Sequence, residues 1–255
     1  MDKPKFLSAF QIEDNTLLYN LYEKLTLAEK IGRDTFTNEF YPPIVWSKLI
    51  DLQGLFSVKV FTNGIFPEAE RKLIAFSSDT IDEYPIELLK VTVKSDFNKL
   101  SHGDYLGALM ALGIKREKFG DLIIDEKSCY FPVVNIISEF VLSNLISIGK
   151  SPCTVEKVDS EVPLPSFKFE EMLVLSSSLR LDCIISALCG LSRNDSLALI
   201  SRGKVLLNYL EAKEKALNLP YPSILSIRGY GKFKILSQAG LTAKGRYKIN
   251  VQKFI

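Results

Sequence analysis

Histidine is almost absent from this chain, because His102 is the single one among 255 residues. A serine–histidine triad would have to use this residue, and the sequence has no GxSxG of the kind that forms a nucleophile elbow. The "RGYGKF" stretch contains a GxG, but no third glycine and no helical pattern follow, so it is not a dinucleotide site. We therefore expect no catalytic centre of these kinds, and a capping or RNA-contact role for His102.

Cysteine and long apolar runs are also scarce. Four cysteines occur without any CxxC spacing, so neither a disulfide framework nor a zinc site is expected. No window holds 18 uninterrupted apolar residues, and "MDKPKFLSAF" lacks the apolar core of a signal peptide. These absences predict a cytoplasmic protein that spans no membrane and holds no metal and no cofactor.

Charge is distributed unevenly along the chain, although the net charge is only +2. Residues 180–255 contain 13 Lys/Arg and 4 Asp/Glu, a formal charge of about +9, and the remainder therefore carries about −7. A basic module joined to an acidic body is typical of proteins that bind a polyanion. The C-terminal third is therefore the place to look for a binding surface.

The hydrophobic pattern predicts an α+β protein with three parts. Residues 1–75 are expected to form an N-terminal α/β region with two helices and a strand. Residues 76–160 follow the order strand–helix–strand–strand–helix–strand, which is that of a ferredoxin-like, or RRM-like, domain. "KLIAFS" is expected as a strand at its start. The Pro-rich residues 161–175 are expected to be a linker before a C-terminal domain at 176–255.

The C-terminal segment begins with two short helices. In "RLDCIISALCG", Leu181, Ile184, Ile185 and Leu188 share one apolar face, and a glycine ends the helix. Ser192 is expected to cap the second helix as in a capping box, and "KVLLN" then becomes a strand. The interspersed cations must stay near solvent, because burying an unpaired charge is costly. They are therefore expected to form one basic surface.

The motifs of this segment resemble the S4 RNA-binding domain. The resemblance covers residues 179–236, from "RLDCIISALCGLSRNDSLALISRGKVLLN" to "SILSIRGYGKFKI". Further upstream, "SHGDYLGALMALGIKREKFGDLIID" and "FPEAERK" are similar to the YlmH family of bacterial S4-domain proteins. In that family an N-terminal region and an RRM-like domain precede the S4 domain, so the resemblance extends over most of the chain.

The resemblance implies a non-enzymatic, monomeric RNA-binding protein of translation. Its expected partners are rRNA and tRNA on the large ribosomal subunit, during ribosome-associated quality control of stalled nascent chains. Asp182 would orient an arginine, and Ser192 would cap its helix and touch the RNA backbone. The implied RNA-binding residues are Arg180, Asp182, Ser192, Arg193, Lys204, Asn208, Arg228, Lys232 and Lys234.

A second RNA contact is expected in the middle of the chain, where "ERK" and "GIKREK" add cations near the histidine. Its residues would be Arg71, Lys72, His102, Lys115 and Arg116. Two other functions remain open at this point. One is an RNA-modifying enzyme related to pseudouridine synthases, which would need a catalytic Asp in an "RLD" motif. The other is a cell-division adaptor, which would not need the basic surface.

Overall fold

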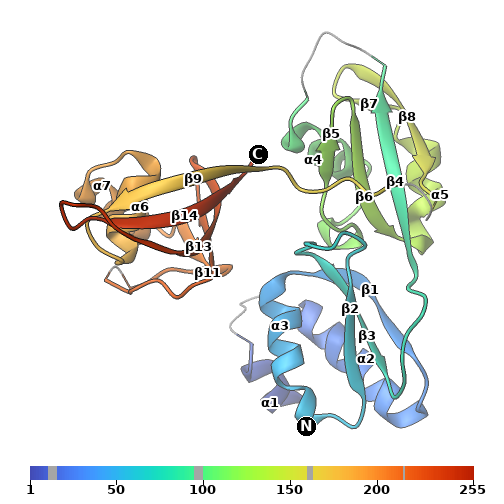
Figure 1. Cartoon of the computed structure of the whole chain (residues 1–255). Helices are drawn as coiled ribbons and strands as arrows, with labels where there is room; N and C mark the ends of the chain where they lie inside the picture. Colours follow the sequence, from blue (N-terminus) through green and yellow to red (C-terminus); the bar gives the residue numbers. More distant parts are fainter. Residues whose placement is uncertain (11–15, 95–99, 160–162, 215) are drawn as a thin grey trace. The chain divides into compact units, whose positions relative to one another are not determined.

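The computed structural model describes residues 1–10, 16–94, 100–159, 163–214 and 216–255. It divides into two compact units, Met1–Ser166 and Phe167–Ile255. Figure 1 shows that each unit is a mixture of helices and sheets, as the sequence predicted. No single helix in the described part of the chain is both long and apolar enough to cross a membrane. The two helices α6 (Leu181–Cys189) and α7 (Arg193–Ser201) would pass that test only as a pair, bent by 111°.

The first unit begins with a subdomain of helices packed on a three-stranded sheet. The order of its antiparallel strands is β1-β3-β2. Its apolar core joins Leu18, Leu21 and Leu25 of one helix to Ile74 and Phe76 of the central strand. The elements are α1 (Lys3–Ser8), α2 (Thr16–Ile31), β1 (Thr35–Tyr41), α3 (Pro43–Asp51), η1 (Gln53–Leu55), β2 (Lys59–Asn63) and β3 (Lys72–Ser77).

The strand "KLIAFS" belongs to this N-terminal sheet and not to the middle one. It is β3, and it pairs with β1 on one side and β2 on the other. Five of its six residues are buried, so it is the central strand of its sheet. The expected boundary at residue 75 therefore cuts through β3. The strand β1, "TFTNEFY", was not predicted from the sequence, because its threonines, asparagine and glutamate weaken the apolar pattern.

The middle subdomain has the element order that the sequence predicted. Its strands are arranged β5-β6-β4-β8-β7, and every pairing is antiparallel. Tyr105 and Leu109 of α4 and Val141 of α5 pack on the sheet residues Leu89 and Phe131. The elements are β4 (Ile86–Val93), α4 (His102–Ala111), η2 (Arg116–Lys118), β5 (Ile123–Asp125), β6 (Ser128–Val134), α5 (Asn135–Asn144), β7 (Ser147–Ile148) and β8 (Ser151–Lys157).

The C-terminal unit is a six-stranded antiparallel sheet with two helices packed on one face. The strand order is β11-β10-β12-β13-β14-β9. Ile184 and Ile185 are fully buried against Phe233 and Ile235 of β13, whereas Leu188 is only partly buried. The elements are β9 (Phe169–Ser176), α6 (Leu181–Cys189), α7 (Arg193–Ser201), β10 (Val205–Leu207), β11 (Leu210–Glu211), β12 (Ser223–Ile227), β13 (Gly231–Leu241) and β14 (Tyr247–Phe254).

The linker before this unit is shorter than the expected residues 161–175, of which 161 and 162 lie outside the described residues. β9 (Phe169–Ser176) occupies the second half of that stretch and pairs with β14 at eight positions, from Phe169–Phe254 to Ser176–Tyr247. The prolines end at Pro165, and the following "FKFEEMLVLS" alternates in burial as an edge strand does. Val174 points into the core and is 6% exposed. The C-terminal unit therefore begins at Phe167 and not at residue 176.

Candidate nucleic-acid interface

Two arginines share one buried carboxylate where α6 and α7 begin. Arg180 donates from Nε and Nη2 to the two oxygens of Asp182, at 3.1 and 3.0 Å. Arg193 donates from Nε to Asp182 Oδ2 at 2.8 Å. The Asp182 side chain is fully buried, whereas those of Arg180 and Arg193 are 36% and 56% exposed. The carboxylate therefore fixes both guanidinium groups while their remaining N–H groups face solvent.

This arrangement explains why a charged residue stands at a buried helix position. A buried carboxylate needs partners that replace its hydration, and two charge-assisted hydrogen-bonding groups provide them. Arg180 is the N-cap of α6, and Arg193 is the first residue of α7. A pair of cations that one carboxylate holds together, each from the start of a helix, is suited to phosphate, because free N–H groups at a helix start also favour anions. Asp182 serves as the support for this pair.

The hydrogen bonds to Asp182 predict an unusually acidic carboxyl group. Burial alone would raise the pKa of Asp182, but the hydrogen bonds from Arg180 and Arg193 outweigh it and lower the pKa to about 2. Because the folded-state pKa is depressed, the stabilisation is complete above the ordinary pKa near 3.8. It is lost as the pH falls toward 2. Carbon-13 NMR titration of the carboxyl group should place its midpoint near 2.

The variant Arg193→Gln provides the matched comparison for this titration. It removes one of the two donors and should move the pKa of Asp182 back toward 3.8. Lys244→Gln, an equal charge change at an exposed turn, should leave the midpoint where it is. A wild-type midpoint near 4 would contradict the shared ion pair.

Ser192 caps α7 in the way that its sequence predicted. Its Oγ accepts a hydrogen bond from the backbone N–H of Asp195 at 3.1 Å, and its hydroxyl donates to Asp195 Oδ2 at 2.6 Å. Gly190 ends the preceding helix with φ of +65°, a conformation that glycine adopts without strain. The short turn between these two residues joins the C-terminus of α6 to the N-terminus of α7, and the Arg193 side chain reaches back to Asp182 in the first turn of α6. Ser192 thereby positions Arg193.

Three predicted RNA-binding residues at the ends of strands, Lys204, Asn208 and Arg228, differ in their contacts. The backbone N–H of Arg228 donates to the Lys204 carbonyl at 2.9 Å, so these two residues lie side by side at one end of β10 and β12. Asn208 instead binds its own fold: its Oδ1 accepts from the Ile224 N–H at 2.8 Å. Its backbone has φ of +47°, which asparagine tolerates better than most residues. Asn208 thus closes the turn between β10 and β11.

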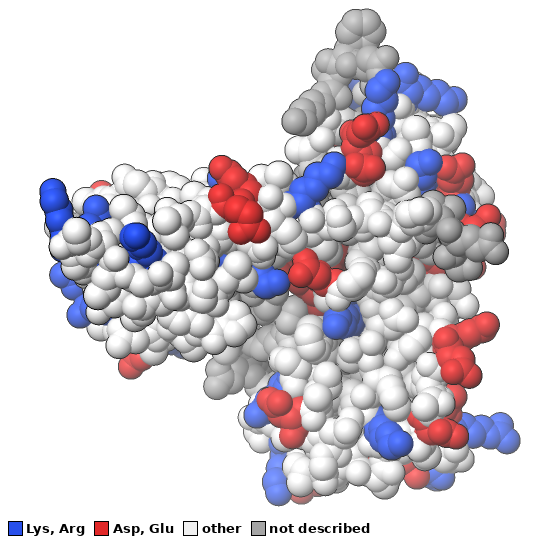
Figure 2. All heavy atoms as spheres, viewed as in Figure 1, with Lys and Arg blue, Asp and Glu red and all other residues white. Residues whose placement is uncertain are grey.

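Lys232 and Lys234 lie on the other face of the sheet from the helices. Their neighbours Phe233 and Ile235 are buried against α6, and successive side chains of a strand point to opposite faces. The single basic surface expected from the sequence is therefore divided. Arg180 and Arg193 lie at the helix starts, and the two lysines lie on the outer face of β13. Figure 2 shows Lys and Arg gathered at the end of this unit near α7 and the β13–β14 turn, and acidic residues over β9.

Two residues of the expected second contact are half-buried at the interface between the first two subdomains. Arg71 donates from Nη2 to the Phe40 carbonyl at 2.9 Å. Arg116 donates from Nη1 to the carbonyls of Phe119 and Gly120, at 2.7 and 3.1 Å. Burial, and then the charge of Arg71, lowers the pKa of Arg116 to about 10. Both side chains thus hydrogen-bond to the protein's own backbone, and their contact with RNA stays a prediction.

The other three residues of that set differ in how they relate to these arginines. The pKa of His102 is lowered, first by desolvation and then by the charge of Arg116, so His102 lies near that arginine. Lys72 lies with its Nζ 4.4 Å from the centre of the Trp46 ring. His102 is the exposed first residue of α4, and Lys115 is exposed at the start of η2. The cations of "ERK" and "GIKREK" were evident from the sequence, but the hydrogen bond from Arg71 to the distant Phe40 carbonyl was not.

Asp121 of the middle subdomain also connects the first two subdomains. Its Oδ2 accepts hydrogen bonds from the backbone N–H groups of Glu70 and Arg71, at 2.6 and 3.0 Å. Asp121→Ala leaves these two donors without that acceptor, which costs about 1–3 kcal/mol for each that finds no water. We expect the first unit to unfold at lower urea concentration, with the single tryptophan, Trp46, as reporter. Glu23→Ala, on the exposed side of α2, is the control and should unfold like wild type.

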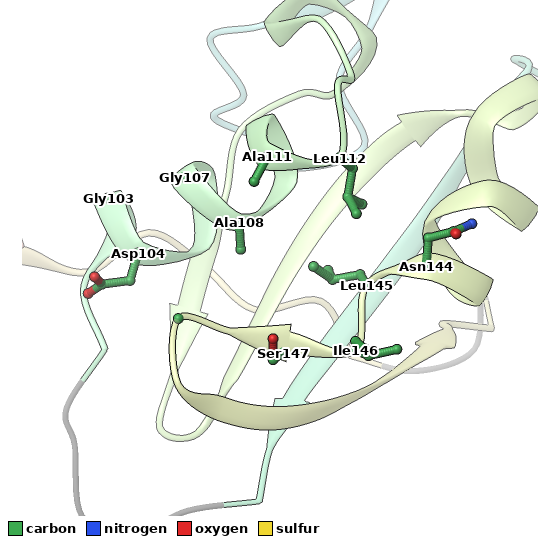
Figure 3. Close-up of a pocket in the computed structure, with 11 residues that line it drawn as sticks. Gly103, Asp104, Gly107, Ala108, Ala111, Leu112, Asn144, Leu145, Ile146 and Ser147 are labelled. Carbon is green, nitrogen blue, oxygen red and sulfur yellow. The ribbon is translucent and has the colours of Figure 1, made fainter.

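A shallow hollow of about 460 Å³ lies between α4 and the β7 turn (Figure 3). One wall is the small-residue face of α4, and the other is formed by Asn144, Leu145, Ile146 and Ser147. Asp104 is the one carboxylate among its lining residues, and it caps α4 by accepting from the N–H and hydroxyl of Ser101. The hollow therefore offers no pair of acid and base groups for catalysis.

The comparisons with known proteins agree with an RNA-binding protein. Residues 80–162 match the family model described as "Putative RNA-binding domain in YlmH". The ribosome-associated protein quality control protein P2 of Bacillus subtilis (strain 168) is 28% identical over 220 residues, which cover 84% of this chain and 86% of the relative. The solved structure of the cell division protein ylmH from Streptococcus pneumoniae matches 59% of this chain and 93% of its own, with 24% identity and a TM-score of 0.49.

This chain thus carries an RNA-binding domain in its middle part. The resemblance to the YlmH family stated from its sequence is confirmed. The family model ends at residue 162, before the C-terminal unit begins. The S4 character of that unit therefore stays a prediction from residues 179–236.

Proposed function

We propose that this protein docks on RNA of the large ribosomal subunit through an S4 domain formed by its C-terminal unit, and that it acts there in quality control of stalled nascent chains. The observation that carries the proposal is the pair Arg180–Arg193, fixed by one buried carboxylate at two helix starts. The name of the Bacillus relative, which places that protein in ribosome-associated quality control, supports the choice of partner.

The binding is expected to be electrostatic at its base and weakly selective for sequence. The unit of residues 167–255 contains 14 Lys/Arg and 6 Asp/Glu, a formal charge of about +8. Such a surface contacts the phosphate backbone. These contacts provide affinity and register but little sequence information. Lys204 and Arg228 lie next to each other and would extend the contact along the backbone.

An RNA-modifying enzyme is the weaker alternative. The "RLD" aspartate that a pseudouridine-synthase-like reaction would need is Asp182, and both its oxygens accept hydrogen bonds from arginines. A fully buried carboxylate in that state is poorly placed to attack a nucleoside. The same residue is well placed to support a binding surface, so we propose a non-enzymatic role.

Sedimentation with purified ribosomal subunits tests the proposal. The protein should sediment with large subunits at moderate salt and not with small subunits. If Arg180, Arg193, Lys204 and Arg228 each meet one phosphate, the logarithm of the association constant should fall with the logarithm of salt with a slope of about −3. Affinity that stays flat between low and moderate salt, or equal binding to both subunits, would contradict the proposal.

A further inference from the structure

The outer face of the C-terminal sheet, turned away from α6 and α7, carries a cluster of aromatic rings and lysines that the proposed docking surface does not use. We propose that this cluster, which we call the outer cluster, binds single-stranded RNA by stacking with unpaired bases. The inference deepens the proposed function, because its ligand is again RNA, but it concerns a separate surface. The outer cluster consists of Phe167, Phe169, Tyr209, Lys232, Lys234 and Phe254.

Phe254 joins the members of the outer cluster. Its ring lies edge-on to that of Phe169, with centroids 4.9 Å apart, and to that of Phe167, at 6.4 Å. Lys232 Nζ lies 5.0 Å from the centre of the Phe254 ring and 5.0 Å from that of Tyr209. Lys232 thus lies between Tyr209, next to β11 at one edge of the sheet, and Phe254 of β14, near the other edge. The rings are half-buried, so they keep solvent-facing surface.

The alternation of the strands explains why these side chains gather outside the core. Phe233, Ile235 and Val251 are buried under the helices, so the residues between them point outward. Lys234 extends the same surface, with its Nζ 6.0 Å from the centre of the Phe169 ring. An outward strand face normally carries small polar or charged residues. Several aromatic rings there are unusual and indicate a binding function.

The combination of rings and cations favours RNA over a protein partner. Alternation places Lys232, Lys234 and Lys248 outward, against two carboxylates: Glu171, which accepts a hydrogen bond from Gln252, and Glu211, which pairs with Leu206 at the β11 edge. Aromatic side chains interleaved with cations are the usual platform for single strands, since rings stack with bases while cations meet phosphates. Duplex RNA keeps its bases stacked inside the helix and cannot use such a platform. The occupant is therefore a strand with unpaired bases.

The experiment compares two labelled probes on the intact protein. The first is a 12-nucleotide single-stranded RNA of mixed sequence, and the second is the blunt duplex of the same sequence. Phe254→Leu keeps an apolar side chain but removes the ring, and should weaken binding of the single strand about fivefold or more. Phe254→Trp keeps a stacking surface and should restore it. Neither change should alter binding of the duplex.

A second experiment tests the two lysines of the outer cluster by removing their charge. Lys232→Gln with Lys234→Gln should lower the salt slope for the single strand by about 1.4, since each phosphate contact contributes roughly 0.7. Lys213→Gln with Lys244→Gln is the matched control, because it removes the same charge from exposed positions of the same unit. Far-UV circular dichroism should show all four proteins folded.

The outcomes separate this inference from the proposed function. Loss of single-strand binding in Phe254→Leu and the lysine pair, with large-subunit binding intact, supports the outer cluster. Normal single-strand binding in both, or an equal loss in the control pair, overturns it. Absence of single-strand binding in the wild type overturns it as well, and leaves a protein partner as the occupant. None of these results bears on the proposed role of Arg180 and Arg193. That role is tested separately, by binding of their variants to the large ribosomal subunit.

Discussion

A C-terminal fragment that begins at Phe167 should fold on its own, whereas a fragment that begins at Ser176 should not. The difference between them is β9, which pairs with β14 from Phe169 to Ser176. Val174 and Met172 of β9 pack on the core of the unit, the former 6% exposed. Deleting β9 removes both side chains from the core and leaves the backbone of β14 as a new open edge.

The expected loss is comparable with the whole stability of such a domain. Burial of one large aliphatic side chain contributes about 1.5–3 kcal/mol, and each lost backbone hydrogen bond adds about 0.5–1.5 kcal/mol. A domain of this size is usually stable by about 5–15 kcal/mol. Fragment 167–255 should therefore unfold cooperatively on heating, as followed by circular dichroism, and fragment 176–255 should show no cooperative transition.

A longer fragment provides the control for this comparison. Residues 163–166 lie before the unit, so fragment 163–255 should have the same melting temperature as fragment 167–255. A sharp transition in fragment 176–255 would show that β9 is dispensable. A melting temperature that rises strongly from fragment 167–255 to fragment 163–255 would show that the unit begins before Phe167.

Local patterns were enough to predict the helices that carry Arg180 and Arg193. The apolar spacing of Leu181, Ile184 and Ile185 predicted α6, and Ser192 predicted the start of α7. Each prediction depends on residues within a few positions of one another, where helix periodicity and capping act. The order of elements in the middle subdomain followed from the same kind of pattern.

Features set by distant residues were not predicted. β9 was read as part of a linker because prolines precede it, and its partner β14 lies some 75 residues further on. Arg71 was predicted as an RNA contact, and its hydrogen bond to the Phe40 carbonyl, 31 residues earlier in the chain, was not predicted. Nothing local in "ERK" distinguishes a solvated cation from one that is bound by another segment.

The division of the basic residues could have been read from the sequence. In "GKFKI", lysines alternate with Phe233 and Ile235, so burial of the apolar pair places both lysines on the opposite face. The aromatic partners were less accessible, because Phe169 and Phe254 lie at opposite ends of the unit's sequence. Only the pairing of β9 with β14 brings them together.

The double variant Arg180→Gln with Arg193→Gln should nearly abolish binding to the large ribosomal subunit while the fold persists. Each guanidinium group presents N–H donors to solvent that Asp182 does not use. A charge-assisted contact to phosphate is commonly worth a factor of about ten or more in affinity, so loss of both should weaken binding by about a hundredfold. The salt slope should become shallower by about 1.4–1.8.

Asp182 determines how this experiment has to be designed. Removing both arginines leaves a buried carboxylate without its cationic partners, which would destabilise the unit by itself. Glutamine is chosen because its amide can still donate a hydrogen bond to Asp182. The triple variant with Asp182→Asn also removes the buried charge, so it should be at least as stable as the double variant and bind as weakly.

Binding of the double variant is measured by sedimentation with large subunits over a salt series. Lys213→Gln with Lys244→Gln, which removes two exposed positive charges elsewhere in the same unit, is the matched control and should bind within about twofold of wild type. Equal losses in the two pairs would mean that net charge alone governs binding. Wild-type binding by the double variant, together with an unchanged melting temperature, would exclude the arginine pair as the docking surface.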